Sequence, residues 1–461
     1  MKLYTVALLV IASITLNAQN IVFNDANFKA ALIADSVDTD KDGEISMAEA
    51  AAIDTIDIVS GNVSSIDELG AFVNVSVLYL RINNLDSFPQ FSFPKLKYLD
   101  LSKNKFKSLN ISGFTVLKEL YLNGNDSLKS VTMLGLDSLE IFNFTGTALK
   151  VIDFTGLSNL KIFSAGMQLD TLHCHGGYHI EHNTISRFSG IKYLDISNHP
   201  TQDKVWLSWQ NFPVGFLMAD NCPKLETVQF IYSAIGGVSF YNDTALKVVQ
   251  MDKYTGSQSI KSIVESTPSL LNFSVGHRED YVNIGDTISI ENHNKLEYLT
   301  IYNVNGIKVK GCGNIIEVQG RAPKCTVQDC PKYVSMQVSN LEEIIIDNCA
   351  TFSTFPQGWS NTPLFAYSLK KVSITNCPSL EKLVIAWYTS KINHLNLTGS
   401  TNLTQLSLGG MDLDTLDLST NSKLTKLECL LNPIKNLDVS YLPDLTYLDC
   451  NTTSMKSLNL C

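Results

Sequence analysis

Charged residues are scarce in this chain, and basic clusters are missing from it. Only 17% of its 461 residues are charged, the net charge is −10, and no basic run interrupts the acidic balance. A protein that binds nucleic acid needs a concentrated positive surface to meet the phosphates. The composition therefore argues against a nucleic-acid partner.

The common catalytic motifs are missing as well. The sequence contains no glycine-rich phosphate loop, no G-x-S-x-G, no H-E-x-x-H and no paired C-x-x-C. Acidic residues are numerous but scattered, so no carboxylate pair typical of a glycosidase can be picked out. The sequence predicts a protein that is not an enzyme.

Long apolar runs are absent after the first residues, so we expect no membrane-spanning segment in the mature chain. The N-terminus has a positive residue, Lys2, a short apolar stretch over residues 5–16 and a plausible cleavage point at Asn17-Ala18. This pattern predicts a secretory signal peptide over residues 1–18, and therefore a secreted or cell-surface protein. A buried apolar strand is the alternative interpretation.

What the chain does contain is a repeat of 21 residues. Residues 424–444 carry L-x-x-L-x-L, then Asn432, then a second L-x-L. The same spacing recurs in 403–423 and again from Leu445 onward. Self-similarity at a fixed period in this range predicts a solenoid.

The spacing also predicts the structure of each coil. In L-x-x-L-x-L the last two apolar residues alternate with polar ones, so both point to one side of a short strand. One such strand cannot bury its face alone, but stacking coils buries a continuous core and pairs the strands into a parallel sheet. Asn432 lies where the chain turns away from the strand, and its amide can satisfy backbone groups there.

Two segments carry this pattern most cleanly: residues 96–109, LKYLDLSKNKFKSL, and residues 424–437. They resemble the bacterial 21-residue type of leucine-rich repeat, L-x-x-L-x-L-x-x-N-x-L-x-x-L-D-L. The resemblance covers nearly all of residues 53–461. It implies a leucine-rich repeat solenoid, mostly β with little helix, that acts as an interaction scaffold without catalysis.

Residues 38–49, DTDKDGEISMAE, match the calcium loop of an EF-hand. Closely spaced carboxylates around a glycine turn supply the hard oxygens that calcium prefers. The predicted ligands are Asp38, Asp40, Asp42, the backbone carbonyl of Glu44, Ser46 and Glu49. The alternative is a degenerate loop that keeps its shape without metal. We expect residues 19–52 to form a helical, EF-hand-like cap that seals the end of the solenoid.

A histidine-rich segment, residues 173–182, is a second candidate metal site. His173 and His175 flank an inward-facing Cys174, so both should face outward on one strand. His179, Glu181 or His182 would complete a transition-metal site. This segment underlies an alternative function as a metal-dependent enzyme, but a polar loop inserted between coils is the favoured explanation.

Most of the ten cysteines are predicted to be small buried residues instead of disulfide partners. Four of them occupy the asparagine position of their coils: Cys222, Cys330, Cys349 and Cys377. Three others fall at inward strand positions: Cys174, Cys429 and Cys450. Side chains on adjacent parallel strands project side by side, which disfavours a bond between the last two.

One face of the early coils gathers residues that favour binding. The strand positions between the buried leucines should face solvent, and stacking in register groups Tyr79, Arg81, Tyr98, Asp100, Glu119 and Tyr121. Tyr and Arg are favoured binding anchors because they offer a large contact area with polar tips. The sequence predicts recognition of a protein or a glycan, or adhesion, through this face. The alternatives are that aromatic residues merely suit strands, and that the protein is a passive structural component of an envelope or matrix.

Overall fold

The structure is a computed structural model that describes several stretches of the chain. These are residues 19–164, 169–175, 191–208, 214–254, 260–276, 287–353, 355, 369–385, 391–451 and 453–460. The chain divides into two compact units, Met1–Gln202 with Asn211–Cys222, and Asp203–Gln210 with Pro223–Cys461. The predicted signal peptide lies outside the described residues.

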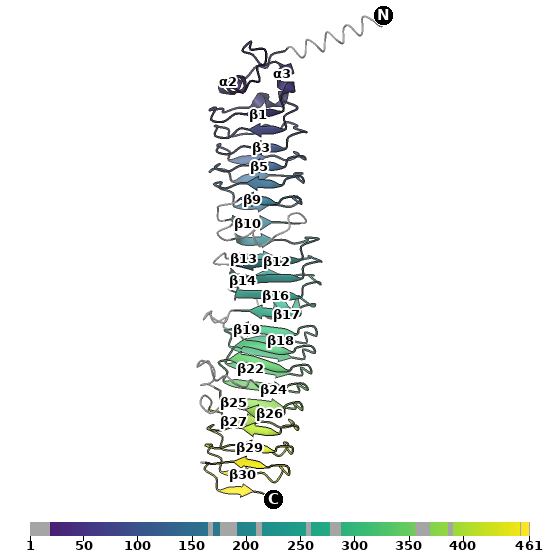
Figure 1. Ribbon diagram of the computed structural model, residues 1–461, viewed down its shortest axis with the longest axis vertical. Coiled ribbons are helices and arrows are strands. Elements are labelled where there is room, and N and C mark those ends of the chain that lie inside the picture. The colour runs from purple at the N-terminus through teal and green to yellow at the C-terminus, as the bar shows by residue number, and fades with distance from the viewer. Residues whose placement is uncertain are drawn as a thin grey trace, which may run out of the picture. The chain divides into compact units, whose positions relative to one another are not determined.

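Two short helices form the N-terminal cap, α2 (Ala26–Ala34) and α3 (Met47–Ala52), shown in purple in Figure 1. The hydroxyl of Ser46 caps α3 and Glu49 completes the predicted capping box. Phe28, on α2, is fully buried. These features agree with the helical cap expected from the sequence.

Asp25 fastens the cap to the first coil. One carboxylate oxygen caps α2 by accepting the N–H groups of Asn27 and Phe28, while the other accepts the N–H groups of Ser64 and Ser65. Burial raises the pKa of Asp25, but these hydrogen bonds outweigh burial and lower it to about 2. The side chain is therefore ionised in the folded protein, and its two oxygens link the N-terminus of α2 to the first coil of the solenoid.

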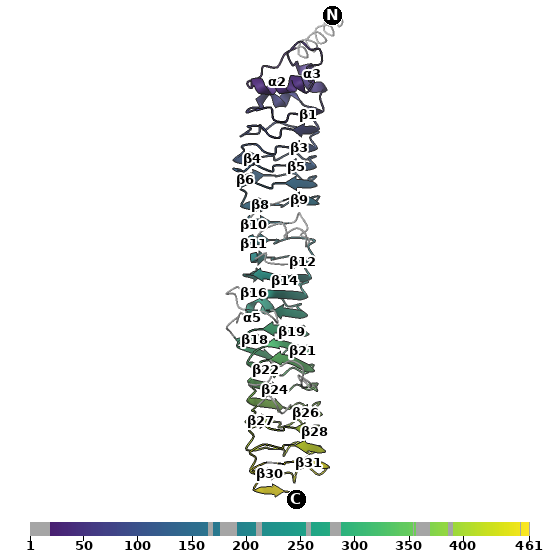
Figure 2. The ribbon, with the colours of Figure 1, turned by 60° about the vertical axis from the view of Figure 1, so that its left-hand side comes forward.

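The first unit continues as stacked coils joined by parallel strands. One sheet contains β1 (Thr55–Asp57), β2 (Val77–Tyr79), β3 (Tyr98–Asp100), β5 (Glu119–Tyr121), β7 (Ile141–Asn143) and β9 (Ile162–Ser164). On the other side of these coils, β4 (Ser108–Asn110) pairs with β6 (Ser130–Thr132) (Figure 2). Further along, a longer set pairs in the order β8 (Val151–Asp153), β10 (Leu169–His173), β11 (Ile191–Asp195) and β13 (Val214–Met218). A 3-10 turn, η1 (Asp67–Ala71), precedes β2.

The second unit is also built from parallel strands. One series contains β12 (Lys204–Ser208), β14 (Thr227–Ile235), β16 (Val248–Tyr254), β17 (Asn272–Val275), β19 (Tyr298–Tyr302), β21 (Glu317–Arg321) and β23 (Ser335–Ser339). A second contains β18 (Thr287–Glu291), β20 (Gly306–Lys310), β22 (Lys324–Gln328), β24 (Glu343–Asp347), β25 (Lys371–Thr375) and β27 (His394–Asn396). The last coils carry β26 (Lys382–Val384), β28 (Gln405–Ser407), β29 (Lys426–Glu428) and β31 (Tyr447–Asp449), with β30 (Asn436–Asp438) beside β32 (Ser457–Asn459). Short elements complete the unit: β15 (Val238–Ser239) and α5 (Ile260–Glu265).

The predicted repeat solenoid of parallel β coils with little helix is confirmed. The coil length varies along it: Tyr98 pairs with Glu119, which is 21 residues later, whereas Ile307 pairs with Cys325, which is 18 residues later. The shorter coils belong to the part of the second unit where strands of five residues line two sides. A coil in which two sides are extended strands has fewer residues in its turns and is therefore shorter.

The core follows the predicted alternation. Leu78, Leu99 and Leu120 are aligned in register on adjacent strands and are fully buried. Each buried leucine contributes roughly 1.5–3 kcal/mol to stability, and each coil supplies several. The hydrophobic stack is therefore the main source of the solenoid's stability.

Asn104 shows why the turn after the strand contains asparagine. Its Oδ1 accepts the N–H of Leu85 at 3.0 Å, and its Nδ2 donates to the carbonyls of Leu80 at 2.9 Å and Leu101 at 3.0 Å. Asn83, Asn125 and Asn432 are buried and bond in the same way. The amide joins each coil to the preceding one where the sheet leaves backbone groups unpaired.

Replacing Asn104 by valine should destabilise the first unit by roughly 3 kcal/mol, because buried backbone groups lose their partners. Hydrogen exchange should show faster exchange at the Leu85 amide, and urea unfolding should shift to lower concentration. The control is Asn123→Ala on the outer face, which we expect to stay within about 0.5 kcal/mol. Equal effects of the two changes would refute the assigned role of Asn104.

Cysteines replace this asparagine in other coils, as predicted for Cys222, Cys330, Cys349 and Cys377. All are buried, and the thiol of Cys222 donates to the carbonyl of Ile196 in the preceding coil at 3.1 Å. Cys312 occupies the same position and was not predicted to do so. The cysteines that the structure describes are all free thiols. Burial raises the pKa of Cys377 to about 11, which keeps this thiol protonated.

Candidate recognition and metal sites

Three tyrosines form a row across the first strands of the first unit. Tyr79, Tyr98 and Tyr121 lie on β2, β3 and β5, and their ring centroids are 4.7 Å and 5.3 Å apart in sequence order. Each ring is half-buried against its neighbours. The strand register aligns Asp57, Tyr79, Asp100, Tyr121 and Asn143 on successive strands. Tyr98 lies two residues before Asp100, so its ring contacts the other two rings diagonally.

Charged groups flank the tyrosine row. The Arg81 guanidinium lies over the Tyr79 ring, 5.4 Å from its centroid, and the Tyr121 hydroxyl donates to Glu119 at 2.9 Å. Burial raises the pKa of Tyr98 above its usual range, and burial together with the Glu119 contact raises that of Tyr121 to about 12. The phenols therefore remain neutral and present rigid, partly polar surfaces.

Asp100 does not face solvent as the alternation predicted. It is only 5% exposed, and its carboxylate accepts the N–H of Ser102 at 2.9 Å. An aspartate two residues before a turn commonly bonds the backbone in this way. The prediction that Asp100 is part of the open face was therefore wrong, while Tyr79, Arg81, Tyr98, Glu119 and Tyr121 do gather there.

The predicted calcium loop has a compact arrangement of carboxylates. Oxygens of Asp38, Asp40 and Asp42 lie within 4.8 Å of one another. Asp38 accepts the N–H groups of Lys41 at 2.7 Å and Gly43 at 2.9 Å, which folds the loop around its glycine. Gly43 has φ of +83°, a conformation that favours glycine.

Glu49 holds the two ends of this loop together through hydrogen bonds to Thr39 and Ser46. One oxygen accepts the N–H of Thr39 at 2.7 Å and the other accepts the N–H and the hydroxyl of Ser46, both at 2.9 Å. Burial raises the pKa of Glu49, but these hydrogen bonds lower it to about 2, so the side chain is ionised. The Glu44 side chain pairs with Lys29 at 2.7 Å, leaving its backbone carbonyl as the predicted ligand. This oxygen-only donor set fits calcium.

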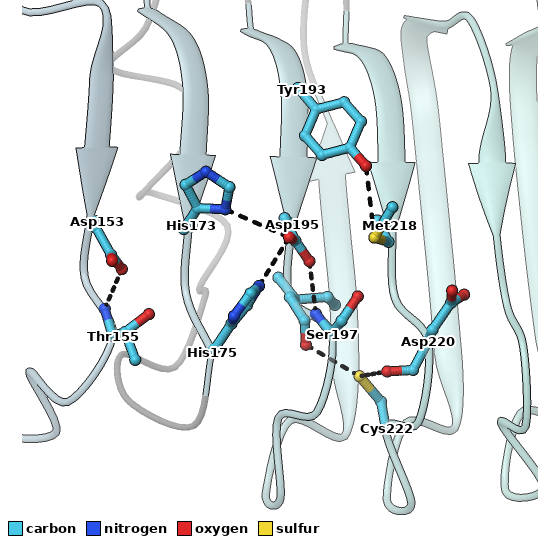
Figure 3. A network of polar contacts seen from close by, with 11 residues as sticks. Asp153, Thr155, His173, His175, Tyr193, Asp195, Ser197, Met218, Asp220 and Cys222 are labelled. Atoms are coloured by element: carbon cyan, nitrogen blue, oxygen red, sulfur yellow. Dashed lines mark hydrogen bonds and ion pairs between the residues drawn. The ribbon is translucent and has the colours of Figure 1, made fainter.

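The two histidines of the candidate transition-metal segment meet an aspartate from the next coil (Figure 3). The Nδ1 atom of His173 lies 3.3 Å from Asp195 Oδ2, and the Nε2 atom of His175 lies 2.7 Å from the same oxygen. Asp195 is the registered partner of His173 across β10 and β11. His179, Glu181 and His182 lie outside the described residues.

Asp195 was missed by the sequence analysis. Burial raises its pKa, but the N–H of Ser197 and the contact with His175 outweigh burial and lower it, so the carboxylate is ionised. The available signal was the coil length, because the residue one coil after His173 must lie next to it. The sequence between the two residues does not show the repeat pattern clearly, so the register could not be predicted there.

Comparison with known proteins supports the repeat assignment for the early coils. Residues 73–126 match the leucine rich repeat family. That segment contains the whole tyrosine row. No curated protein is significantly similar to the chain.

Several solved structures are similar in fold. The functional domain of InlJ from Listeria monocytogenes is 16% identical over 93% of this chain and 80% of its own, with a TM-score of 0.29. Internalin C2 from the same organism is 16% identical over 56% of this chain and 100% of its own, with a TM-score of 0.30. A leucine-rich repeat protein from Leptospira interrogans is 13% identical over 89% and 93%, with a TM-score of 0.28. These values carry no functional argument.

Among the residues that the structure describes, no helix combines the length and the apolar character needed to cross a bilayer.

Proposed function

We propose that this protein is an exported, non-enzymatic recognition scaffold that binds a protein or glycan, or mediates adhesion, through the tyrosine row. The observation that supports the proposal most strongly is the contact between the tilted rings of Tyr79, Tyr98 and Tyr121 on adjacent leucine-rich repeat coils. The apolar leucines face inward, so these rings do not hold the core together. They are large aromatic surfaces left available on the outer side of the sheet.

The physical chemistry of the tyrosine row suits binding. Rings that contact one another and are already half-buried have little side-chain freedom to lose, so docking a partner costs little conformational entropy. Tyr and Arg are enriched among the residues that dominate binding energies, and Arg81 lies at the edge of the row. The neutral phenols provide hydrogen-bonding tips without the cost of desolvating a charge.

A capture experiment tests this function. The mature chain is immobilised with calcium present and screened against glycan arrays and extracellular or surface proteins, next to a variant with Tyr79, Tyr98 and Tyr121 changed to serine. The proposal expects a ligand that the wild type retains and the variant loses. Ligands retained equally by both would contradict it, and the absence of any ligand would favour a passive structural role.

We further propose that residues 38–49 bind one calcium ion that stiffens the cap. The ion would be held by the carboxylates of Asp38, Asp40, Asp42 and Glu49, by the Glu44 carbonyl and by Ser46. An affinity on the order of 10⁻⁴–10⁻³ M would follow if the loop behaves as extracellular modules do. Support comes from the convergence of the three aspartates and from the ionised Glu49 behind them.

Calcium should therefore stabilise the first unit. At a free concentration about 100 times the dissociation constant, binding to the folded state alone contributes about 2.7 kcal/mol. Scanning calorimetry with calcium and with chelator should show a higher melting temperature with the ion.

The double change Asp40→Asn, Asp42→Asn should remove that response while leaving the melting temperature in chelator nearly unchanged, because both side chains are exposed. Asp54→Asn, an exposed carboxylate outside the loop, is the matched control and should respond like the wild type. A response to calcium that survives in the double variant would exclude the loop as the site.

A further inference from the structure

The contact between His175 and Asp195 has unusual geometry. The two atoms are 2.7 Å apart, yet Nε2 of His175 is buried and has no hydrogen-bond partner, because the ring does not aim its N–H direction at the oxygen. A buried polar atom left in this state costs roughly 1–3 kcal/mol. The two groups are therefore close together without a well-aligned hydrogen bond, an arrangement expected of two ligands that face a shared ion.

Three ligand atoms converge at this place on the outer side of β10 and β11. Nδ1 of His173, Nε2 of His175 and a carboxylate oxygen of Asp195 all lie within 4.8 Å of one another. Ligands bound to a tetrahedral zinc ion at about 2.0–2.1 Å lie roughly 3.4 Å apart. The 3.3 Å between His173 Nδ1 and Asp195 Oδ2 is close to that separation, while the 2.7 Å between His175 Nε2 and the same oxygen is shorter.

The backbone holds the three ligands in place. Cys174, between the two histidines, points inward and is fully buried, and its N–H donates to the Asp195 carbonyl at 2.9 Å. The carboxylate of Asp195 is oriented by the N–H of Ser197 at 3.0 Å (Figure 3). Such supporting contacts, which orient a ligand without touching the ion, are typical of metal sites.

We propose that His173, His175 and Asp195 form a binding site for a divalent transition-metal ion, with zinc as the reference ion. Two imidazoles and one carboxylate provide three ligands and leave a fourth position open for water or a partner's side chain. The nitrogen ligands separate this site from the oxygen-only calcium loop, because calcium prefers oxygen donors. The proposal adds a metal site to the scaffold and assigns no catalysis to it.

The test is a titration of the full chain with zinc, followed by calorimetry or by competition with a coloured chelator. The wild type should bind one equivalent. Each of His173→Gln, His175→Gln and Asp195→Asn should weaken binding at least about tenfold, the scale found even for residues that only support ligands. His394→Gln, an exposed histidine in the second unit, should bind like the wild type.

Cobalt provides a second readout that a folding defect does not imitate. Wild-type protein loaded with cobalt should give the visible absorption of a low-coordinate nitrogen and oxygen site, and one equivalent of zinc should remove it. Circular dichroism verifies that the variants are folded. The proposal fails if the wild type binds no zinc, or if binding survives in His175→Gln and Asp195→Asn. Loss of zinc binding in the calcium-loop variant Asp40→Asn, Asp42→Asn instead would also overturn it.

Discussion

Replacing Gly320 by alanine should destabilise the second unit by about 3–5 kcal/mol, the largest effect of any single change proposed for the fold. Gly320 lies in β21, between Ile301 of β19 and Val338 of β23. Its φ is +146°, a backbone conformation that residues with a side chain rarely adopt. A Cβ atom there would overlap the carbonyl oxygen of Ile301, which is backbone and cannot move away alone.

The matched control is Gly313→Ala, in the loop between β20 and β21. A Cβ atom at Gly313 meets nothing nearer than the Asn294 side chain at 3.4 Å, and we expect a change within about 1 kcal/mol. Stacked coils contact mainly their neighbours, so hydrogen exchange should accelerate most in β19, β21 and β23. Similar unfolding curves for the two variants would show that the close contact between Gly320 and the Ile301 carbonyl does not determine the stability of the unit.

Changing Tyr79, Tyr98 and Tyr121 together to serine should abolish partner binding. Two aromatic anchors at about 2 kcal/mol each already correspond to roughly a thousandfold loss of affinity. The far-ultraviolet spectrum should remain that of the wild type, because the leucines beneath the tyrosine row stay in place. The dissociation constant is measured by surface plasmon resonance or by calorimetry.

The control for this change is a second triple variant with exposed tyrosines of the second unit, Tyr298, Tyr441 and Tyr447, changed to serine. It removes the same number of rings from the outer surface and should bind as the wild type does. If it loses affinity and the first variant does not, the recognition surface lies in the second unit.

The architecture was predictable from the sequence because each coil repeats the same physical problem. The alternation around Leu99 specifies which side faces the core, and the buried asparagine specifies the turn. Substitution of that asparagine by cysteine was readable wherever the coils are regular. Cys312 was missed because it lies between two glycines, whereas Cys222, Cys349 and Cys377 each follow an asparagine.

Features that depend on contacts between coils were harder to predict. Asp100 and Tyr98 lie on either side of Leu99 in one strand, yet Asp100 is buried. It lies in register between Tyr79 and Tyr121 of the neighbouring coils and accepts the N–H of Ser102. Asp25 reads as a helix cap, while its bonds to Ser64 and Ser65 depend on how the cap docks. Asp195 pairs with His173 in a register that the sequence between the two residues does not reveal.

The most direct test of the central claim, recognition through the tyrosine row, is oxidative footprinting of the chain with and without its captured ligand. Tyr79, Tyr98 and Tyr121 should be oxidised more slowly in the complex, while Tyr298, Tyr441 and Tyr447 keep their rates. Unchanged oxidation of the first three residues, with protection of tyrosines in the second unit, would contradict the proposed recognition surface.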